Sequence, residues 1–78
     1  MAEQVVAEIQ RNPTEKLLVQ LREYRGKWYI DARIYYLDEA DEQWKPTKKG
    51  LSLNDETSPW LRQALEKAEA LYGDLAAK

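Results

Sequence analysis

The sequence contains no cysteine and no histidine among its 78 residues. This excludes disulfides, the usual cysteine and histidine ligands of zinc, and catalytic groups built on a thiol or an imidazole. No apolar run approaches the ~20 residues that a membrane-spanning helix needs. The start, Met-Ala-Glu-Gln, also lacks the basic and then apolar profile of a signal peptide. We expect a cytoplasmic protein that is not an enzyme, binds no metal or cofactor and does not engage a membrane.

The chain is also short, and 78 residues leave room for one domain. A domain of this size buries only about 60% of the surface that its unfolded chain exposes, so its core alone provides a small margin of stability. Because neither disulfides nor zinc can reinforce the fold, oligomerisation is the remaining means. We therefore expect a homodimer.

The formal net charge is only -2, but the charge is distributed unevenly along the chain. Residues 16–37 hold five basic and two acidic side chains, residues 38–44 hold four acidic and no basic ones, and residues 45–53 hold three lysines and no acid. Two basic segments separated by an acidic one form a single patch if the fold brings them together, and local potential governs attraction to phosphate. The alternative is a solvated surface of mixed sign.

Apolar residues alternate with polar ones in two neighbouring segments, 16–24 and 27–37, which predicts two β-strands. Arg25-Gly26 lies between them, and glycine tolerates the positive φ of a tight turn, so we expect a two-residue hairpin loop. This loop length places Tyr24 opposite Lys27, and the alternation then separates an apolar face from a basic and aromatic one. The apolar face carries Leu17, Val19, Leu21, Trp28, Ile30, Ala32, Ile34 and Tyr36, and the other face carries Arg22, Tyr24, Lys27, Tyr29, Asp31, Arg33 and Tyr35.

The segment after this hairpin predicts two shorter strands. Residues 38–42 form an acidic turn, which lacks the glycine and the ligand spacing of a calcium loop and so predicts no metal site. We expect a strand over 43–45 that Pro46 either ends or places at a sheet edge, because proline cannot donate a hydrogen bond to a neighbouring strand. A loop over 47–50 and a short strand over 51–53 follow.

The C-terminal part predicts a helix, and the N-terminal part is ambiguous. Asn54 can cap a first helical turn over 55–57, but Ser58-Pro59 is the stronger signal of a helix start. Apolar residues then recur at spacings of three and four as far as Leu75. The first fifteen residues fit a strand or a helix, since Val5 and Ile9 suit both. We divide the chain into an N-terminal extension, residues 1–15, and a functional domain, residues 16–78.

Aromatic rings stand next to cations at two places, with Trp44 beside Lys45 and Tyr24 beside Arg25 and Lys27. Stacking of a base on such a ring contributes about 1–3 kcal/mol and tolerates any base, while the cations follow the phosphate backbone. This pattern is typical of proteins that bind single-stranded nucleic acid. Trp28 and Trp60, in contrast, are expected to pack in the core or against a second subunit.

Three segments resemble the positive cofactor four family of transcriptional coactivators. They are Tyr24-Arg25-Gly26-Lys27, the strand from Ile30 to Tyr36, and the run Trp44-Lys45-Pro46-Thr47-Lys48-Lys49-Gly50-Leu51-Ser52-Leu53-Asn54. The similarity spans about residues 16–72. It implies an α+β fold, in which a curved four-stranded antiparallel sheet is followed by a C-terminal helix. It also implies a symmetric homodimer that binds single-stranded or unwound DNA.

The resemblance also implies which residues contact nucleic acid. Tyr36 stands where the family commonly has a stacking tryptophan, yet strict alternation places it on the face of Trp28, opposite Tyr24. Either strand curvature brings Tyr36 to the binding groove, or this residue belongs to the core. The nucleic-acid-binding residues that we predict are Tyr24, Arg25, Lys27, Arg33, Tyr36, Trp44, Lys45, Lys48 and Lys49.

The sequence thus indicates a coactivator-like protein that binds single-stranded DNA with little sequence preference, in transcription regulation or in replication and repair. The expected partners are single-stranded DNA, a second copy of the chain, and proteins of transcription or replication. The short acidic start lacks the Ser- and Lys-rich extension of eukaryotic members, which favours a prokaryotic or phage-type member, associated with the nucleoid if prokaryotic. Two alternatives stay open, a protein-interaction module that uses the C-terminal helix and a single-stranded RNA binder.

Overall fold

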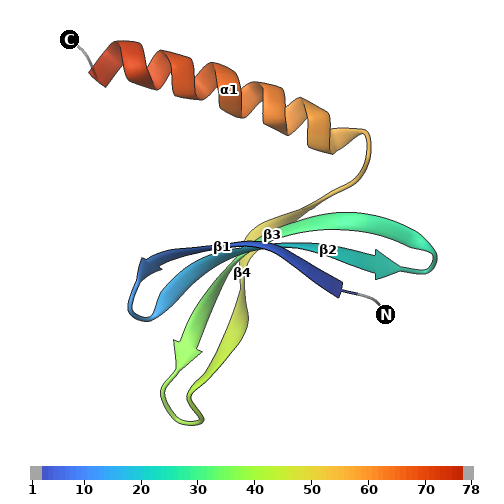
Figure 1. Ribbon diagram of the computed structural model, residues 1–78, viewed down its shortest axis with the longest axis vertical. Helices are drawn as coiled ribbons and strands as arrows, with labels where there is room; N and C mark the ends of the chain where they lie inside the picture. The colour runs from blue at the N-terminus through green and yellow to red at the C-terminus, as the bar shows by residue number, and fades with distance from the viewer. Residues whose placement is uncertain (1–2, 77–78) are drawn as a thin grey trace.

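The computed structural model describes residues 3–76, which form four strands followed by one helix (Figure 1). The strands pair in chain order, each antiparallel to the next, and no crossover interrupts the sheet. The α+β class and the four-stranded antiparallel sheet are therefore confirmed. The elements are β1 (Glu3–Asn12), β2 (Glu15–Tyr24), β3 (Lys27–Asp38), β4 (Gln43–Leu53) and α1 (Thr57–Ala76).

The predicted central hairpin is confirmed residue by residue. Arg25 and Gly26 have φ values of 53° and 79°, so both residues of the two-residue loop adopt the left-handed region that such a turn requires. Tyr24 lies opposite Lys27, and the pairing continues without a break to Glu15 opposite Tyr36. Because the register has no bulge, the alternation of side chains predicted from the sequence holds along the whole hairpin.

The N-terminal segment, which fits either a strand or a helix by its sequence, forms the edge strand β1. It pairs with β2 from Glu3 opposite Arg22 to Asn12 opposite Glu15. The side chain of Asn12 organises the turn between these strands, because its Oδ1 accepts hydrogen bonds from the backbone N and the Oγ1 of Thr14, at 3.0 and 3.2 Å. Register shifts between Val5 and Ala7, and again near the turn, show that β1 is bulged.

The prediction of two short strands over 43–45 and 51–53 is wrong, because both belong to the single strand β4. Pro46 lies opposite Tyr35 and Gly50 lies opposite Arg33, so three residues of β4 stand across from one residue of β3. Thr47 closes this bulge, since its Oγ1 donates to the carbonyl oxygen of Ile34 at 2.7 Å and its own carbonyl accepts from Arg33 at 2.9 Å. Proline is tolerated here because β4 is an edge strand and is bulged at this point.

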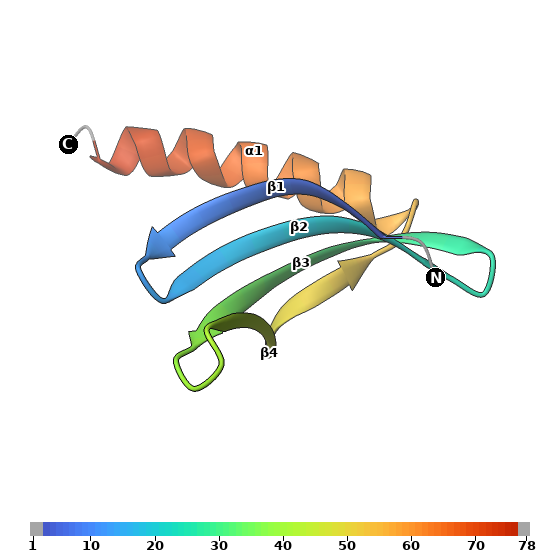
Figure 2. The same ribbon diagram turned by 60° about the horizontal axis from the view of Figure 1, so that its bottom comes forward.

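The sheet curves strongly, and its two faces differ in what covers them (Figure 2). On one face, here called the concave face, Gln20 and Asp31 are only 4% exposed although no helix covers them. Curvature and neighbouring side chains bury them. This face is defined by Lys16, Leu18, Gln20, Arg22 and Tyr24 of β2, by Lys27, Tyr29, Asp31, Arg33, Tyr35 and Leu37 of β3, and by their partners on β1 and β4.

The apolar face, here called the convex face, is left open within one chain. Helix α1 starts on this side, where Ser58 and Pro59 border a hollow with Leu21 and Trp28, but it then runs away from the sheet (Figure 1). None of the described helix residues is buried. Trp28 and Trp60 are 51% and 69% exposed, so the packing expected for them does not form within a single chain.

The start of the helix is fixed by Asn54. Its side-chain oxygen accepts hydrogen bonds from the backbone N atoms of Glu56 and Thr57, at 2.9 and 2.8 Å, and these bonds cap the turn that leads into α1 at Thr57. Of the two caps that the sequence offers, Asn54 is therefore the one used, and Ser58 already lies within the helix. Within residues 3–76, no helix is both long and apolar enough to cross a membrane.

Candidate nucleic-acid interface

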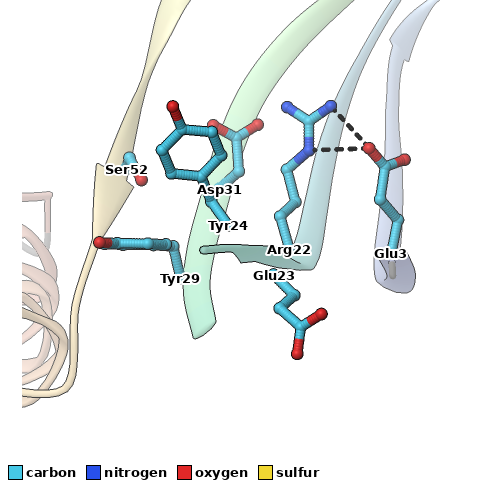
Figure 3. Close-up of a pocket in the computed structure, with 7 residues that line it drawn as sticks. All are labelled: Glu3, Arg22, Glu23, Tyr24, Tyr29, Asp31 and Ser52. Atoms are coloured by element: carbon cyan, nitrogen blue, oxygen red, sulfur yellow. Dashed lines mark hydrogen bonds and ion pairs between the residues drawn. The ribbon is translucent and has the colours of Figure 1, made fainter. Parts of the chain in front are cut away.

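The concave face contains an open hollow of about 420 Å³ at the end near the β2–β3 turn. Strict alternation along the hairpin brings Arg22, Tyr24 and Tyr29 to the same face, and Ser52 joins them from β4 because it lies opposite Asp31. Figure 3 shows the rings of Tyr24 and Tyr29 on one side of this hollow, near Ser52 and Asp31, and Arg22 turned toward Glu3 on the other side. Glu23 completes the lining but points away from the other side chains.

The floor of the concave face is polar and internally bonded. The two carboxylate oxygens of Asp31 accept hydrogen bonds from Arg33, with Nε at 3.3 Å and Nη2 at 3.1 Å. Arg33 also donates from Nη1 to the carbonyl of Thr47, which holds the guanidinium in one orientation. Gln20 donates from Nε2 to the hydroxyl of Tyr35 at 3.0 Å. Arg33 is thus a positioned cation whose charge is already shared with Asp31.

Tyr24 and its neighbours form the exposed end of this face. The guanidinium carbon of Arg25 lies 5.1 Å from the centroid of the Tyr24 ring, within the range of a cation–π contact. The positive φ of Arg25 and Gly26 folds the turn so that Arg25 sits over the ring that precedes it. Tyr24, Arg25 and Lys27 are all exposed to solvent, so a ring and two cations are available together at this end.

Trp44 provides a second ring on the concave face. It lies opposite Leu37 on β3, and the ammonium of Lys16 stands 4.5 Å from its ring centroid. Lys16 also donates to Glu8 at 2.8 Å. Sequence reasoning missed Lys16, because β2 and β4 are not neighbouring strands and no local pattern relates residues 16 and 44. The only available signal is that alternation places Lys16 on the basic face of the hairpin.

Tyr36 and Lys45 lie on the convex face. The register places them opposite one another, and Lys45 forms ion pairs with Asp38 at 2.6 Å and with Asp41 at 3.0 Å. The hydrogen bonds that the Lys45 ammonium donates to these carboxylates raise the pKa of Lys45 above its usual value of 10.5, and they lower the pKa of Asp38 below 3.8. Strand curvature therefore does not bring Tyr36 round to Tyr24.

Lys48 and Lys49 lie in the bulge of β4, and both are exposed. The residue after them, Gly50, packs tightly against β3. A Cβ at Gly50 would lie 2.7 Å from the carbonyl oxygen of Ala32 and 2.8 Å from the Cβ of Arg33. Only glycine fits without displacement, so the Lys-Lys-Gly run combines two exposed cations with close packing beside Arg33.

Arg22 lines the hollow, and it is paired with Glu3 of β1. Its Nη2 and Nε lie 2.9 and 3.2 Å from the same carboxylate oxygen of Glu3. The hydrogen bond to Glu3 raises the pKa of Arg22, so the guanidinium stays charged and partly compensated. Sequence reasoning placed Arg22 on the basic face and could not foresee its pairing with β1.

Comparison with known proteins identifies the family of this chain. The family described as Transcriptional Coactivator p15 (PC4) matches residues 11–64, which is more than half of the chain. The chain belongs to the PC4 family. The matched stretch runs from the end of β1 through the whole hairpin, the β4 bulge and the first turns of α1. The resemblance inferred from the Lys-Pro and Lys-Gly motifs is thereby confirmed.

Solved structures of bacterial and phage PC4 homologues share the fold. BPSL1147, a PC4 homologue from Burkholderia pseudomallei, is 29% identical over 87% of this chain and 98% of its own, with a TM-score of 0.79. A second crystal form of that protein gives a TM-score of 0.77 at the same identity, over 87% of this chain and 90% of its own. A bacteriophage T5 homologue, implicated in recombination-dependent DNA replication, is 28% identical over 94% of this chain and 88% of its own, with a TM-score of 0.69. These relatives agree with a prokaryotic or phage-type member of the PC4 family.

Proposed function

We propose that this PC4-family protein binds single-stranded DNA with little sequence preference on the concave face of its sheet. The observation that carries the proposal is the gathering of two rings, Tyr24 and Trp44, with several cations on one face of a curved sheet. Exposed rings stack on unpaired bases of any identity, and cations follow the phosphates. The residues assigned to this role are Tyr24, Arg25, Lys27, Arg33, Trp44, Lys48 and Lys49, with Lys16 and Arg22 added from the structure.

The same geometry favours a single strand over a duplex. Stacking on Tyr24 or Trp44 requires a base that has left its own stack, and a duplex offers such bases only after unwinding. The hollow beside Tyr24 and Tyr29 is open, and Asp31 and Ser52 are among the residues that line it. Unpaired bases can lie there against the two tyrosine rings.

The proposal includes a homodimer formed through the convex face and helix α1. The side chains of Trp28, Trp60, Leu65 and Tyr72 are more than half exposed in the single chain. Exposed apolar area of this extent marks an interface, and a small domain without disulfides gains stability by merging its core with that of a second copy. A two-fold arrangement leaves the concave faces free for nucleic acid.

The process served belongs to transcription regulation or to replication and repair. The PC4 family takes its description from a transcriptional coactivator, p15, and the T5 homologue is implicated in recombination-dependent DNA replication. Both processes expose single strands. We therefore propose that the protein protects or stabilises unwound DNA in one of them, together with protein partners of that machinery.

A titration monitored by fluorescence anisotropy tests the binding proposal. One labelled single-stranded oligonucleotide, the same sequence as a duplex, and the same sequence as RNA are compared at two salt concentrations. We expect the single-stranded DNA to bind more tightly than the duplex, with an affinity that falls steeply as salt rises. Equal or tighter binding of the duplex, or affinity that does not change with salt, would contradict the proposal, and tighter RNA binding would reassign the substrate.

A further inference from the structure

Two cations of the concave face are paired with carboxylates of the edge strand β1. Glu3 binds Arg22 at 2.9 Å, and Glu8 binds Lys16 at 2.8 Å. Both cations project from β2 onto the face that carries Tyr24 and Trp44. Strand β1 therefore holds two negative charges at positions where a nucleic acid backbone would place phosphates.

A bulge in β1 makes this double pairing possible. Glu3 and Glu8 are an odd number of positions apart, so a regular strand would direct them to opposite faces of the sheet. The register shift between Val5 and Ala7 reverses the alternation, and Glu3 then lies opposite Arg22 while Glu8 lies opposite Leu18, both inward-facing positions. One extra residue in β1 thus directs both carboxylates to the concave face.

These two pairs differ from the pair on the floor of the same face. The Asp31 side chain is 5% exposed and holds Arg33 from below, so its contact belongs to the packed structure. The side chains of Glu3 and Glu8 are 47% and 56% exposed, and those of their partners Arg22 and Lys16 are 42% and 15% exposed. Ion pairs with a solvent-exposed carboxylate contribute little to stability, so another anion can displace Glu3 and Glu8 without unfolding the sheet.

We propose that β1 carries built-in competitors for phosphate, in which Glu3 and Glu8 occupy Arg22 and Lys16 until a nucleic acid backbone displaces them. The proposal rests on the function proposed above and identifies residues that restrain affinity. A carboxylate and a phosphate cannot occupy the same cation at once. Each ion pair therefore lowers the affinity for nucleic acid, and bound nucleic acid destabilises the ion pair by the same factor. The protein then binds a single strand less tightly than its cations allow and releases it more readily.

The competition also changes how binding responds to salt. Salt screens the attraction between each glutamate and its cation, so the competing ion pairs weaken as the salt concentration rises. This effect offsets part of the loss of affinity that salt causes through the phosphate contacts. Each phosphate contact on a single strand otherwise contributes about 0.7 to the slope of log affinity against log salt. The salt slope of the natural sequence is thus shallower than its number of groove cations predicts.

The test compares two double variants that change the net charge equally. Glu3→Gln with Glu8→Gln removes the competitors, whereas Glu39→Gln with Glu42→Gln removes two carboxylates from the exposed β3–β4 turn, where neither forms an ion pair among the described residues. With a labelled oligo-dT probe, we expect the first variant to bind roughly threefold to tenfold more tightly, since each exposed pair contributes a few-fold. Its salt slope should become steeper, by at most about 1.4 for the two cations. The control should change neither quantity by a comparable amount.

The outcomes separate this inference from the proposed function. Binding by the natural sequence with no gain in the Glu3/Glu8 variant, or an equal gain in the control, overturns the competition and leaves the proposed function standing. Failure of both the natural sequence and the Glu3/Glu8 variant to bind overturns both. Binding that appears only after the two glutamates are replaced supports a strong form of the competition.

A measurement on the natural sequence keeps the inference testable if the variant does not fold. The side-chain carboxyl carbons of glutamate can be followed by NMR as oligo-dT is added. We expect the signals of Glu3 and Glu8 to move toward those of unpaired glutamates, with Glu39 unchanged as an internal reference. Signals of Glu3 and Glu8 that remain fixed at saturation would overturn the displacement.

Discussion

The ammonium of Lys16 lies 4.5 Å from the centre of the Trp44 ring, although these residues belong to strands that are not neighbours in the sheet. The curvature of the sheet across β3 brings them together. A cation over this ring adds a positive charge beside an aromatic surface on which a base can stack. Trp44 and Lys16 are therefore expected to act as one unit in binding.

The two rings of the concave face should carry the stacking contribution. We expect Tyr24→Ala and Trp44→Ala each to lose about 1–3 kcal/mol of affinity for a single-stranded oligonucleotide. Tyr36→Ala is the matched control, because Tyr36 is a partly exposed ring on the convex face. Anisotropy titrations of the three variants, with circular dichroism to verify folding, make the comparison. Equal losses in all three, or none in the first two, would remove stacking from the concave face.

The lysines of the β4 bulge should follow the phosphate backbone. Lys48→Ala combined with Lys49→Ala is expected to weaken binding to all single-stranded sequences alike and to flatten the salt slope by about 0.7 per contact. The control pair is Lys45→Ala with Lys67→Ala, because Lys45 is held by two aspartates on the convex face and Lys67 is on the helix. Titrations over a range of salt concentrations give the slopes. A slope that stays unchanged in the folded bulge variant would show that these lysines only solubilise the protein.

Gly50 should be required for the stability of the sheet and for the position of the Arg33 side chain. The nearest atoms to an added Cβ belong to the β3 backbone and to the first carbons of Arg33, which cannot move freely. We expect Gly50→Ala to lower the free energy of unfolding by about 1–3 kcal/mol, as overpacking does. Gly73→Ala is the control, since no atom lies within 4 Å of an added Cβ on the helix, and it should raise stability by about 0.5–1 kcal/mol. Urea unfolding measures both, and a neutral Gly50→Ala would contradict the packing argument.

Dimerisation should depend on the exposed rings of the convex side. Sedimentation equilibrium at micromolar concentration is expected to give twice the mass of one chain, and Trp60→Ala should weaken the dimer by about 2 kcal/mol, as loss of a buried interface tryptophan does. Val6→Ala is the control, because Val6 is similarly exposed but belongs to the edge strand β1 and not to the helix stripe. A folded monomer at these concentrations would contradict the dimer and leave the helix stripe open to another protein partner.

The features that the sequence predicts are those that depend on neighbouring residues. Alternation over 16–24 and 27–37, together with a two-residue turn at Arg25-Gly26, determines one register, and each step of it is reproduced in the structure. The helix follows from the spacing of its apolar residues. It starts at Thr57, because Asn54, and not Ser58, caps its first turn. Local chemistry suffices for these elements.

The errors and omissions all concern contacts between residues that are distant along the chain. The segment from Pro46 to Gly50 reads as a loop, since proline and two lysines suit one, but hydrogen bonds from Thr47 and Arg33 hold it to β3 as a bulge. The N-terminal segment has too few apolar residues to decide between helix and strand. Pairing with β2 decides for the strand, because the backbone groups of β2 would otherwise lack partners on that side.

The sequence by itself determined the class of fold, the basic and aromatic face of the central hairpin, and the motifs that mark the PC4 family. Tertiary structure decided which charges on that face are already occupied. The pairing of Arg22 with Glu3 and of Lys16 with Glu8 depends on a bulge in β1, and the approach of Lys16 to Trp44 depends on the curvature of the sheet. The alternation of side chains in the sequence describes a flat, regular strand. Bulges and curvature are departures from that regularity, and they depend on how neighbouring strands pack.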